Sequence, residues 1–181
     1  MSRKVNLSKY EKAGYHPGRN VIVRALWYVT NMLFFKASWC TCYGWKRFLL
    51  RAYGAQVGAK VVIKPCVNIK YPWHLAIGEN SWIGEKVWID NLANVTIGQN
   101  CCVSQGALLL CGNHDYKKES FDLITGEIML KDGAWVCAKA IVCPGVTIGE
   151  GCVLTAGSVA TKNLERDAIY QGNPAVLKKT L

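Results

Sequence analysis

The residue best suited to chemistry in this chain of 181 residues is His114. It is one of three histidines, and it stands in a polar segment, residues 111–116, that interrupts an otherwise regular repeat. A neutral imidazole accepts a proton from a hydroxyl near pH 7, and an interruption of this kind usually marks a binding loop. His114 is therefore our candidate general base.

The residues around His114 do not indicate a covalent intermediate on the protein. Cys111 and Ser104 lack a recognisable arrangement of base and orienting group, so we expect Cys111 to be a packed residue. Asp115 follows His114 directly and is expected to point elsewhere. A backbone carbonyl is then the group expected to fix the imidazole tautomer.

The elements that must position His114 follow from an aliphatic residue that returns every six positions. A helix spaces apolar residues three and four apart and a simple strand two apart, so a sustained period of six indicates stacked short parallel strands. The aliphatic positions are Val57, Ile63, Ile69, Ile77, Ile83, Ile89, Ile97, Val103 and Leu109, then Val136, Val142, Ile148, Leu154 and Ala160. Four residues after most of them stands a small or modest residue: Val61, Val67, Val87, Ala93, Cys101, Ala107, Ala140, Val146, Cys152 and Ser158.

Three such hexads would form one triangular turn, and about five turns would fit into the repeat. Glycine often follows the aliphatic residue, as at Gly58 and Gly78, where a corner requires positive φ or a close approach of the backbone. Residues 57–181 are therefore predicted to form an all-β parallel β-helix. Its loop is expected at residues 113–130 and its carboxyl-terminal tail at residues 163–181.

Residues 1–56 are predicted to be a separate basic segment with helices. Between residues 20 and 53 apolar residues recur at three- and four-residue steps, which indicates two helices broken near residues 40–44. We expect these helices to cap the first turn and to pack against neighbouring subunits, protecting an open β edge. The apolar run at residues 25–35 is too short to cross a bilayer, which takes about 20 residues.

Peripheral membrane attachment is the alternative role for this segment. Its aromatic residues are mixed with basic ones, a composition that suits a helix lying on anionic lipid. The basic residues concerned are Arg24, Lys36, Lys46, Arg47 and Arg51.

Charge and cysteine content limit the function classes. Residues 1–70 hold thirteen Lys and Arg against one acid, Glu11, a balance of +12, whereas the remaining residues balance at −2. No helix-turn-helix, zinc-finger or RNP pattern accompanies the basic third, so we expect no nucleic-acid partner. The nine cysteines show no CxxC spacing, so they indicate no metal site. We expect them to act as small hydrophobic residues in a reducing compartment. The start lacks a secretory apolar core, so we expect a cytoplasmic protein, with the membrane periphery as the alternative.

Several motifs resemble the hexapeptide-repeat acyltransferases. Asp90-Asn91, His114-Asp115 and residues 120–125 are similar to the colanic acid biosynthesis acetyltransferase branch, and a wider span is similar to galactoside, maltose and serine acetyltransferases. The resemblance implies a left-handed coil and a histidine that deprotonates an acceptor hydroxyl, which attacks the thioester of acetyl-CoA directly. It also implies a homotrimer with each site between two subunits.

The same resemblance implies the binding residues. Stretches around Trp135, Ala156 and Gly172 resemble a coenzyme A groove, with Cys137 and Val176 as departures from the family pattern. The implied cofactor-binding residues are Ala138, Ala156, Gly157, Thr161, Lys162 and, for phosphate, Lys179. The implied acceptor-binding residues are Asp90, Asn91 and Asn113, although Asp90-Asn91 fits a plain corner turn equally well.

These observations favour an O-acetyltransferase that moves acetyl from acetyl-CoA to a hydroxyl of a sugar or glycan precursor, without a metal. Two alternatives remain at this point. One is acetylation of another small acceptor, such as serine or an antibiotic. The other is a non-catalytic hexapeptide-repeat scaffold.

Overall fold

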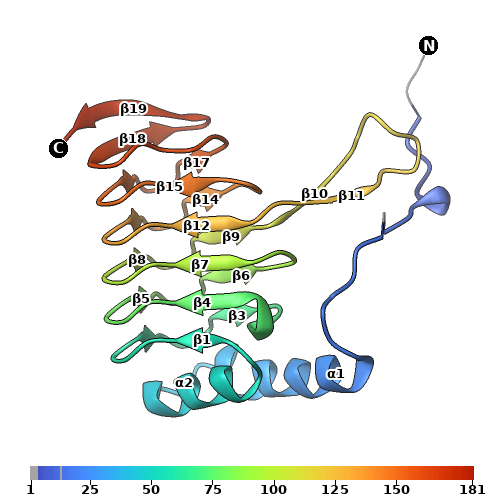
Figure 1. Ribbon diagram of the computed structural model, residues 1–181, viewed down its shortest axis with the longest axis horizontal. Coiled ribbons are helices and arrows are strands. Elements are labelled where there is room, and N and C mark those ends of the chain that lie inside the picture. The colour runs from blue at the N-terminus through green and yellow to red at the C-terminus, as the bar shows by residue number, and fades with distance from the viewer. Residues whose placement is uncertain (1–3, 13) are drawn as a thin grey trace.

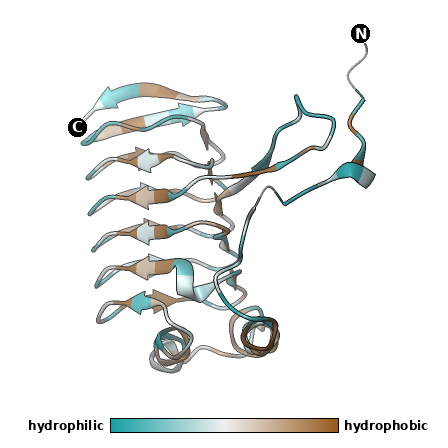
Figure 2. Cartoon of the chain, turned by 45° about the vertical axis from the view of Figure 1, so that its right-hand side comes forward, coloured by the Kyte–Doolittle hydropathy of each residue, from teal (hydrophilic) through white to brown (hydrophobic). Residues whose placement is uncertain are grey.

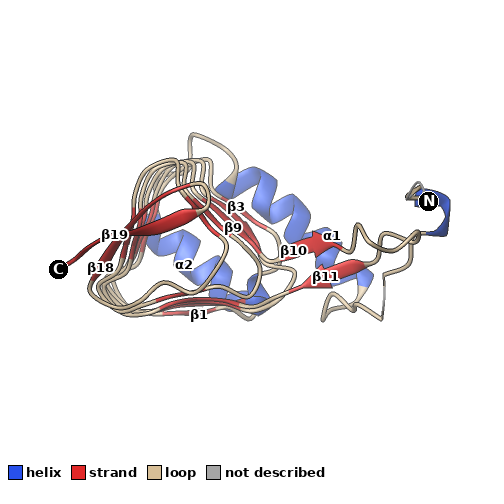
Figure 3. Cartoon of the chain, turned by 90° about the horizontal axis from the view of Figure 1, so that it is seen from above, coloured by secondary structure: helices blue, strands red, loops and turns tan. Residues whose placement is uncertain are grey.

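The computed structural model describes residues 4–12 and 14–181, and most of them wind into a left-handed coil with a triangular cross-section (Figures 1 and 3). Five turns are complete, and a bridge between Ile148 and Leu164 begins a sixth. The prediction of a left-handed parallel β-helix is confirmed.

Short strands stack into the three sides of this coil, named here sheets A, B and C. Sheet A contains β1 (Gln56–Val57), β4 (Leu75–Ile77), β7 (Val95–Ile97), β12 (Ile128–Leu130) and β15 (Thr147–Ile148). Sheet B contains β2 (Val62–Ile63), β5 (Trp82–Ile83), β8 (Cys102–Val103), β13 (Trp135–Val136), β16 (Val153–Leu154), β18 (Ala168–Gly172) and the antiparallel β19 (Ala175–Thr180). Sheet C contains β3 (Asn68–Ile69), β6 (Trp88–Asp90), β9 (Leu108–Leu110), β14 (Ile141–Val142) and β17 (Val159–Ala160).

The predicted aliphatic positions form the core of the coil. Each of them is buried, because its side chain points into the coil, whereas the residue directly before it points outward and is at least partly exposed. Gly78 shows why glycine follows them: a Cβ there would lie 2.5 Å from the amide nitrogen of Gln99 in the next turn. Close approach of the backbone therefore explains this corner glycine.

Two helical segments lie beneath the first turn (Figure 1). α1 (Val21–Thr30) continues into a π-helical turn, η2 (Asn31–Phe35), and α2 (Tyr43–Ala52) follows after a break. The prediction of two helices is confirmed, with the break at residues 36–42. Short 3-10 turns form at η1 (Leu7–Lys9) and η3 (Pro72–His74).

Side chains from these helices satisfy the carbonyl groups of the first turn. After the strands, N–H groups of each turn donate to carbonyls of the turn above, as Gly58 N does to Ile77 O, whereas corner residues such as Asn80 donate to the turn below. The strand carbonyls of the first turn therefore face the helices. Trp27 Nε1 donates to Ile69 O at 2.9 Å, and Lys46 Nζ donates to Ile63 O at 3.2 Å. The predicted cap is therefore built largely from side-chain donors.

The coil is interrupted once, by a hairpin that projects from the corner between sheets C and A (Figures 1 and 3). Its strands are β10 (Gly112–His114) and β11 (Leu123–Thr125). The excursion ends earlier than the predicted loop of residues 113–130, because Ile128–Leu130 already pairs with β7.

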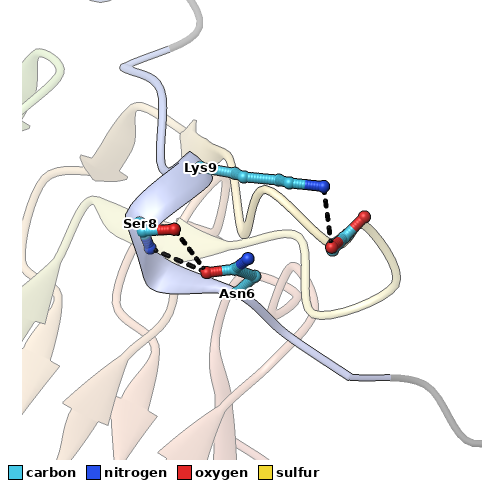
Figure 4. A network of polar contacts seen from close by, with 4 residues as sticks. Asn6, Ser8 and Lys9 are labelled. Atoms are coloured by element: carbon cyan, nitrogen blue, oxygen red, sulfur yellow. Dashed lines mark hydrogen bonds and ion pairs between the residues drawn. The ribbon is translucent and has the colours of Figure 1, made fainter.

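The amino-terminal segment runs along this hairpin (Figures 1 and 4). Asn6 N donates to the carbonyl oxygen of Glu119 at 2.9 Å, and Lys9 Nζ lies 3.0 Å from the Glu119 carboxylate. Asn6 also accepts hydrogen bonds from Ser8. The segment therefore brings residues from the start of the chain to the predicted catalytic loop.

None of the helices in residues 4–12 and 14–181 has the length and hydropathy needed to cross a bilayer. The same described residues contain no group of three or more His, Cys, Asp or Glu side chains that could hold a metal ion.

Candidate active site

His114 ends β10 and is partly buried. Its Nδ1 lies 3.0 Å from the carbonyl oxygen of Phe121. Because a carbonyl oxygen only accepts hydrogen bonds, we assign the ring proton to Nδ1, which leaves a lone pair on Nε2 of the neutral imidazole. This tautomer has the free acceptor nitrogen that a general base needs.

Phe121 holds the imidazole from a second direction. The two rings stack at 4.4 Å between centroids with an angle of 4°, and Tyr10 tilts against His114 at 5.7 Å. Phe121 has φ of 51°, a left-handed conformation that is uncommon for a bulky residue. Strained residues of this kind cluster at functional sites, where the surrounding structure maintains them.

A cavity of about 290 Å³ lies beside His114. It is formed by the amino-terminal segment, α1, the corner after β3, and the hairpin. Its lining residues are Tyr10, Lys12, Tyr15, Pro17, Arg24, Lys70, Tyr71, Leu92, His114 and Leu123. Aromatic side chains with a few polar groups are a common composition for a small-molecule site.

The polar groups of this cavity are incompletely paired. Within the described residues, the Tyr15 hydroxyl and Arg24 Nε are buried and have no hydrogen-bond partner. Buried polar atoms nearly always have partners, so these two groups point to a polar ligand. Burial raises the pKa of the Tyr15 phenol, which keeps the hydroxyl protonated and able to donate.

The structure separates the three predicted acceptor-binding residues. Asp90 is 7% exposed and forms an ion pair with Lys70 at 2.9 Å, next to the cavity. Asn91 is fully buried, and its amide accepts from Tyr71 N and donates to Tyr71 O. This pairing favours a structural role for Asn91, which fixes Tyr71 in the cavity wall.

Asn113 and Asp115 flank the histidine on its strand. Asn113 is exposed, and its side-chain oxygen accepts from His114 N at 2.8 Å. Asp115 accepts from the Lys117 amide at 3.0 Å, a local turn contact. The partner of the imidazole is the Phe121 carbonyl, the kind of group predicted for that role.

The predicted cofactor-binding residues occupy two corners of the coil and its end. Ala138 and Ala156-Gly157 stack on neighbouring turns between sheets B and C, where Gly157 N donates to Ala138 O at 2.9 Å. A Cβ added to Gly157 would meet nothing within 4 Å, so this corner is open. Thr161 and Lys162 follow β17 at the corner between sheets C and A, and Lys179 is exposed on β19.

One chain therefore places His114 and the Ala138 corner at opposite edges of sheet C. The hairpin that carries His114 projects away from its own coil (Figure 3). Within one chain the two groups therefore stay apart.

The cysteines near the site are packed residues. Cys111 is buried, and burial raises the pKa of its thiol to about 11. A thiol with so high a pKa holds little thiolate at neutral pH and is a poor nucleophile. All nine cysteines, which lie in the described part of the chain, are free.

Sequence reasoning missed the residues that line the cavity from the start of the chain. Tyr10 and Tyr15 lie in a polar stretch without periodicity, so no pattern connected them with His114. Arg24 did carry a signal, because it is the single charged residue in the apolar run of residues 21–35. Such a residue is expected to face a polar site.

No family profile matches the chain. A search of known proteins finds a protein of Escherichia coli strain K12 named colanic acid biosynthesis acetyltransferase WcaF, which is 38% identical over 160 residues and covers 88% of each chain. Galactoside O-acetyltransferase of the same strain is 27% identical over 129 residues, covering 70% of this chain and 64% of that protein.

Solved structures show the same fold. The hexapeptide-repeat acetyltransferase VCA0836 of Vibrio cholerae, complexed with acetyl coenzyme A, has a TM-score of 0.81 at 21% identity, covering 100% of this chain and 99% of that one. A galactoside acetyltransferase in complex with coenzyme A has a TM-score of 0.78 at 24% identity, with coverages of 88% and 80%.

Proposed function

The chain belongs to the hexapeptide-repeat acetyltransferases, and on that premise we propose that it transfers acetyl from acetyl-CoA to a hydroxyl of a sugar or glycan precursor, with His114 as general base. The observation that carries this proposal is the hydrogen bond between His114 Nδ1 and Phe121 O, which leaves Nε2 free to accept a proton. The names of the similar proteins support a sugar acceptor.

In the proposed reaction the acceptor oxygen attacks the thioester carbonyl carbon while Nε2 of His114 takes the hydroxyl proton. The tetrahedral intermediate then collapses, and its carbon–sulfur bond breaks. The imidazolium returns the proton to the sulfur, so the products are an acetyl ester and coenzyme A as the thiol. Phe121 O stabilises the transient imidazolium through Nδ1–H.

The acceptor is proposed to occupy the cavity beside His114. The Tyr15 hydroxyl and Arg24 Nε supply unused donors, and Asp90 with Lys70 supplies a charged pair at the edge. Asn113 would contribute from the rim, and Asn91 would act by holding Tyr71.

We propose that acetyl-CoA lies along the small-residue corner of a neighbouring subunit. Ala138, Ala156 and Gly157 leave room for the thin pantetheine arm. Thr161 and Lys162, at the other edge of sheet C, and Lys179 on β19 would meet the nucleotide end, where the two lysines would pair with phosphates. No metal takes part in this proposal.

A homotrimer would complete each site between two subunits. The exposed tryptophans of the outer faces support this assembly. Trp82 and Trp135 on sheet B and Trp88 on sheet C are about half exposed in the single chain. Flat faces with exposed tryptophans are suited to subunit packing. The free cysteines fit the reducing cytoplasm as the site of the reaction.

The test combines calorimetry and turnover. Wild-type protein is expected to bind acetyl-CoA and to release free thiol in the presence of a sugar from an acceptor panel, and Lys162→Ala is expected to weaken acetyl-CoA binding about tenfold. Turnover with serine or with an antibiotic, but with no sugar, would move the assignment to another small acceptor. Absence of acetyl-CoA binding would overturn the proposal in favour of a scaffold.

A further inference from the structure

The outward side of α1 and η2 is apolar along its whole length. Its exposed large side chains are Val21, Ile22, Leu26, Tyr28, Val29, Met32 and Leu33, each between 41% and 67% exposed. The opposite side buries Trp27 and Phe35, and Arg24, the single charged residue of the two elements, is half-buried toward the cavity. A helix in contact with water normally carries polar residues on its outer side.

The second helix extends this surface. Trp39, Trp45 and Phe48 are 65%, 42% and 57% exposed, and Phe34 connects them to η2. Ring centroids lie 5.7 Å apart for Phe34 and Trp39, 6.0 Å for Phe34 and Trp45, and 5.3 Å for Trp45 and Phe48. We call the ten exposed residues of the two helices and their connection the basal surface.

The basal surface lies at one end of the coil, beneath the first turn (Figure 1). In Figure 2 the helix that the amino-terminal segment enters is coloured largely as hydrophobic. A ring of subunits packed through sheets B and C would leave every basal surface on the same end of the assembly. The result would be one broad apolar face rather than scattered patches, and a large contiguous apolar patch marks an interaction site.

The charge around the basal surface identifies its partner. Residues 1–70 contain a single acid, Glu11, and Arg19, Lys36 and Lys60 are exposed near the helices. Each basic residue close to an anionic membrane contributes about 1 kcal/mol of attraction. Tryptophan and tyrosine are also the residues preferred at the level of lipid headgroups.

The surface and the candidate site are continuous. A second cavity of about 340 Å³, between η2 and sheet C, shares Arg24, Lys70 and Tyr71 with the cavity beside His114 and also touches Tyr28 and Lys36. A second copy seated on the basal surface would close the path from this surface through the second cavity to His114. A bilayer would instead bring membrane-anchored acceptors to that path. This step rests on the proposed function.

We propose that the basal surface docks on a lipid bilayer with anionic headgroups, with α1 and η2 lying in the plane of the interface. The fifteen residues of α1 and η2 extend roughly 22 Å, too short to cross a bilayer but long enough to lie in one leaflet. The exposed aliphatic side chains enter the acyl boundary, and the basic residues around them contact the headgroups.

Vesicle flotation tests this proposal directly. The wild-type chain is expected to bind vesicles of phosphatidylcholine with 30% phosphatidylglycerol at least about tenfold more tightly than phosphatidylcholine alone. Leu26→Glu with Val29→Glu is expected to reduce binding at least about tenfold. The matched control is Val176→Glu with Leu177→Glu, since these residues are 51% and 52% exposed at the other end of the coil. Equal binding by the basal variant and wild type, or no binding by wild type, overturns the proposal.

Fluorescence quenching keeps the test independent of the folding of the glutamate variants. Brominated lipids are expected to quench part of the wild-type tryptophan emission, and this quenching is expected to disappear in Trp39→Phe with Trp45→Phe, which retains five other tryptophans. Light scattering in the absence of lipid tests whether a second copy of the chain, rather than a bilayer, covers the basal surface. A basal variant with half the wild-type mass would show that a second copy covers the surface, and would overturn docking on a bilayer.

Discussion

Two groups of basic residues in the first third of the chain have opposite environments. In α2, Lys46 is fully buried, and Lys46, Arg47 and Arg51 donate to backbone carbonyls of the first turn. Beside His114, Arg24 has a buried Nε with no partner among the described residues, and Lys70 pairs with a carboxylate at the cavity edge. The first group stabilises the coil, and the second group surrounds a space.

The positive net charge of residues 1–70 therefore has two physical origins. The first turn presents free carbonyl oxygens, and only donors can satisfy them, so Lys and Arg replace the missing strand. At the other end β18 pairs with β19 through backbone hydrogen bonds, and no basic cap is needed. Net charge alone cannot separate a cap from a binding site; the bonding partners can.

Substitution of Lys46 is expected to have the largest effect on stability. Lys46→Ala leaves the carbonyls of Ile63 and Lys64 without their donor and opens space beside Phe35, which should lower the free energy of unfolding by about 3 kcal/mol. Urea unfolding measures this change, and the acceptor KM of the folded fraction should not move. A variant as stable as wild type would remove the distinction between the two groups.

Arg24→Ala is expected to have the converse effect. Loss of an unused charged donor in the cavity should raise the acceptor KM about tenfold or more and leave the melting temperature within a degree or two. Steady-state kinetics together with a thermal melt measure both quantities. Lys131→Ala, at an exposed position on the coil, is the matched control and should change neither quantity. A drop in stability without a change in KM would assign Arg24 to the cap.

Phe121→Leu is expected to give a smaller effect. The substitution keeps the backbone carbonyl that fixes His114 but removes the stacked ring, so kcat should fall about threefold to tenfold with little change in acetyl-CoA affinity. Calorimetry and initial rates separate the two effects. A weakened acetyl-CoA affinity with unchanged kcat would argue against a positioning role for this ring.

Buried thiols predict a loss of stability in alkali, a response to a change of conditions rather than of sequence. Burial raises the pKa of Cys101, Cys111 and Cys152 to about 11, against an ordinary value of 9.0. The folded state therefore keeps protons that the unfolded state loses, so their contribution is complete below pH 9 and is lost as the pH rises through 11. Unfolding at pH 8 and pH 10 should show the decrease, and Ellman's reagent at pH 8 should reach Cys42 at once but these three only on unfolding.

The sequence was sufficient to predict the coil, because a local rule repeats throughout it. A residue such as Ile83 or Leu154 shows its inward position by spacing alone, and both are fully buried. The rule failed beside the hairpin, where Leu130 and Ala134 are core residues that the interruption concealed. The two helices were also predictable from their spacing.

The cavity could be predicted only in part, because it joins segments that are distant in sequence. His114 was identified by its place in the interrupted repeat, but Tyr15 reaches it through an irregular segment whose path no local pattern encodes. Lys46 shows the same limit: as a basic residue on an amphipathic helix it suggested a lipid contact, yet it is buried against the first turn.

The most direct test of the proposed activity is the rate of acceptor-dependent thiol release by His114→Ala, measured with acetyl-CoA binding on the same sample. A general base contributes typically 10²- to 10⁴-fold, so kcat should fall within that range. The affinity for acetyl-CoA should stay within about twofold, because the proposed cofactor corner does not contain His114. A variant that binds acetyl-CoA and retains wild-type turnover would contradict the assignment of His114 as the base.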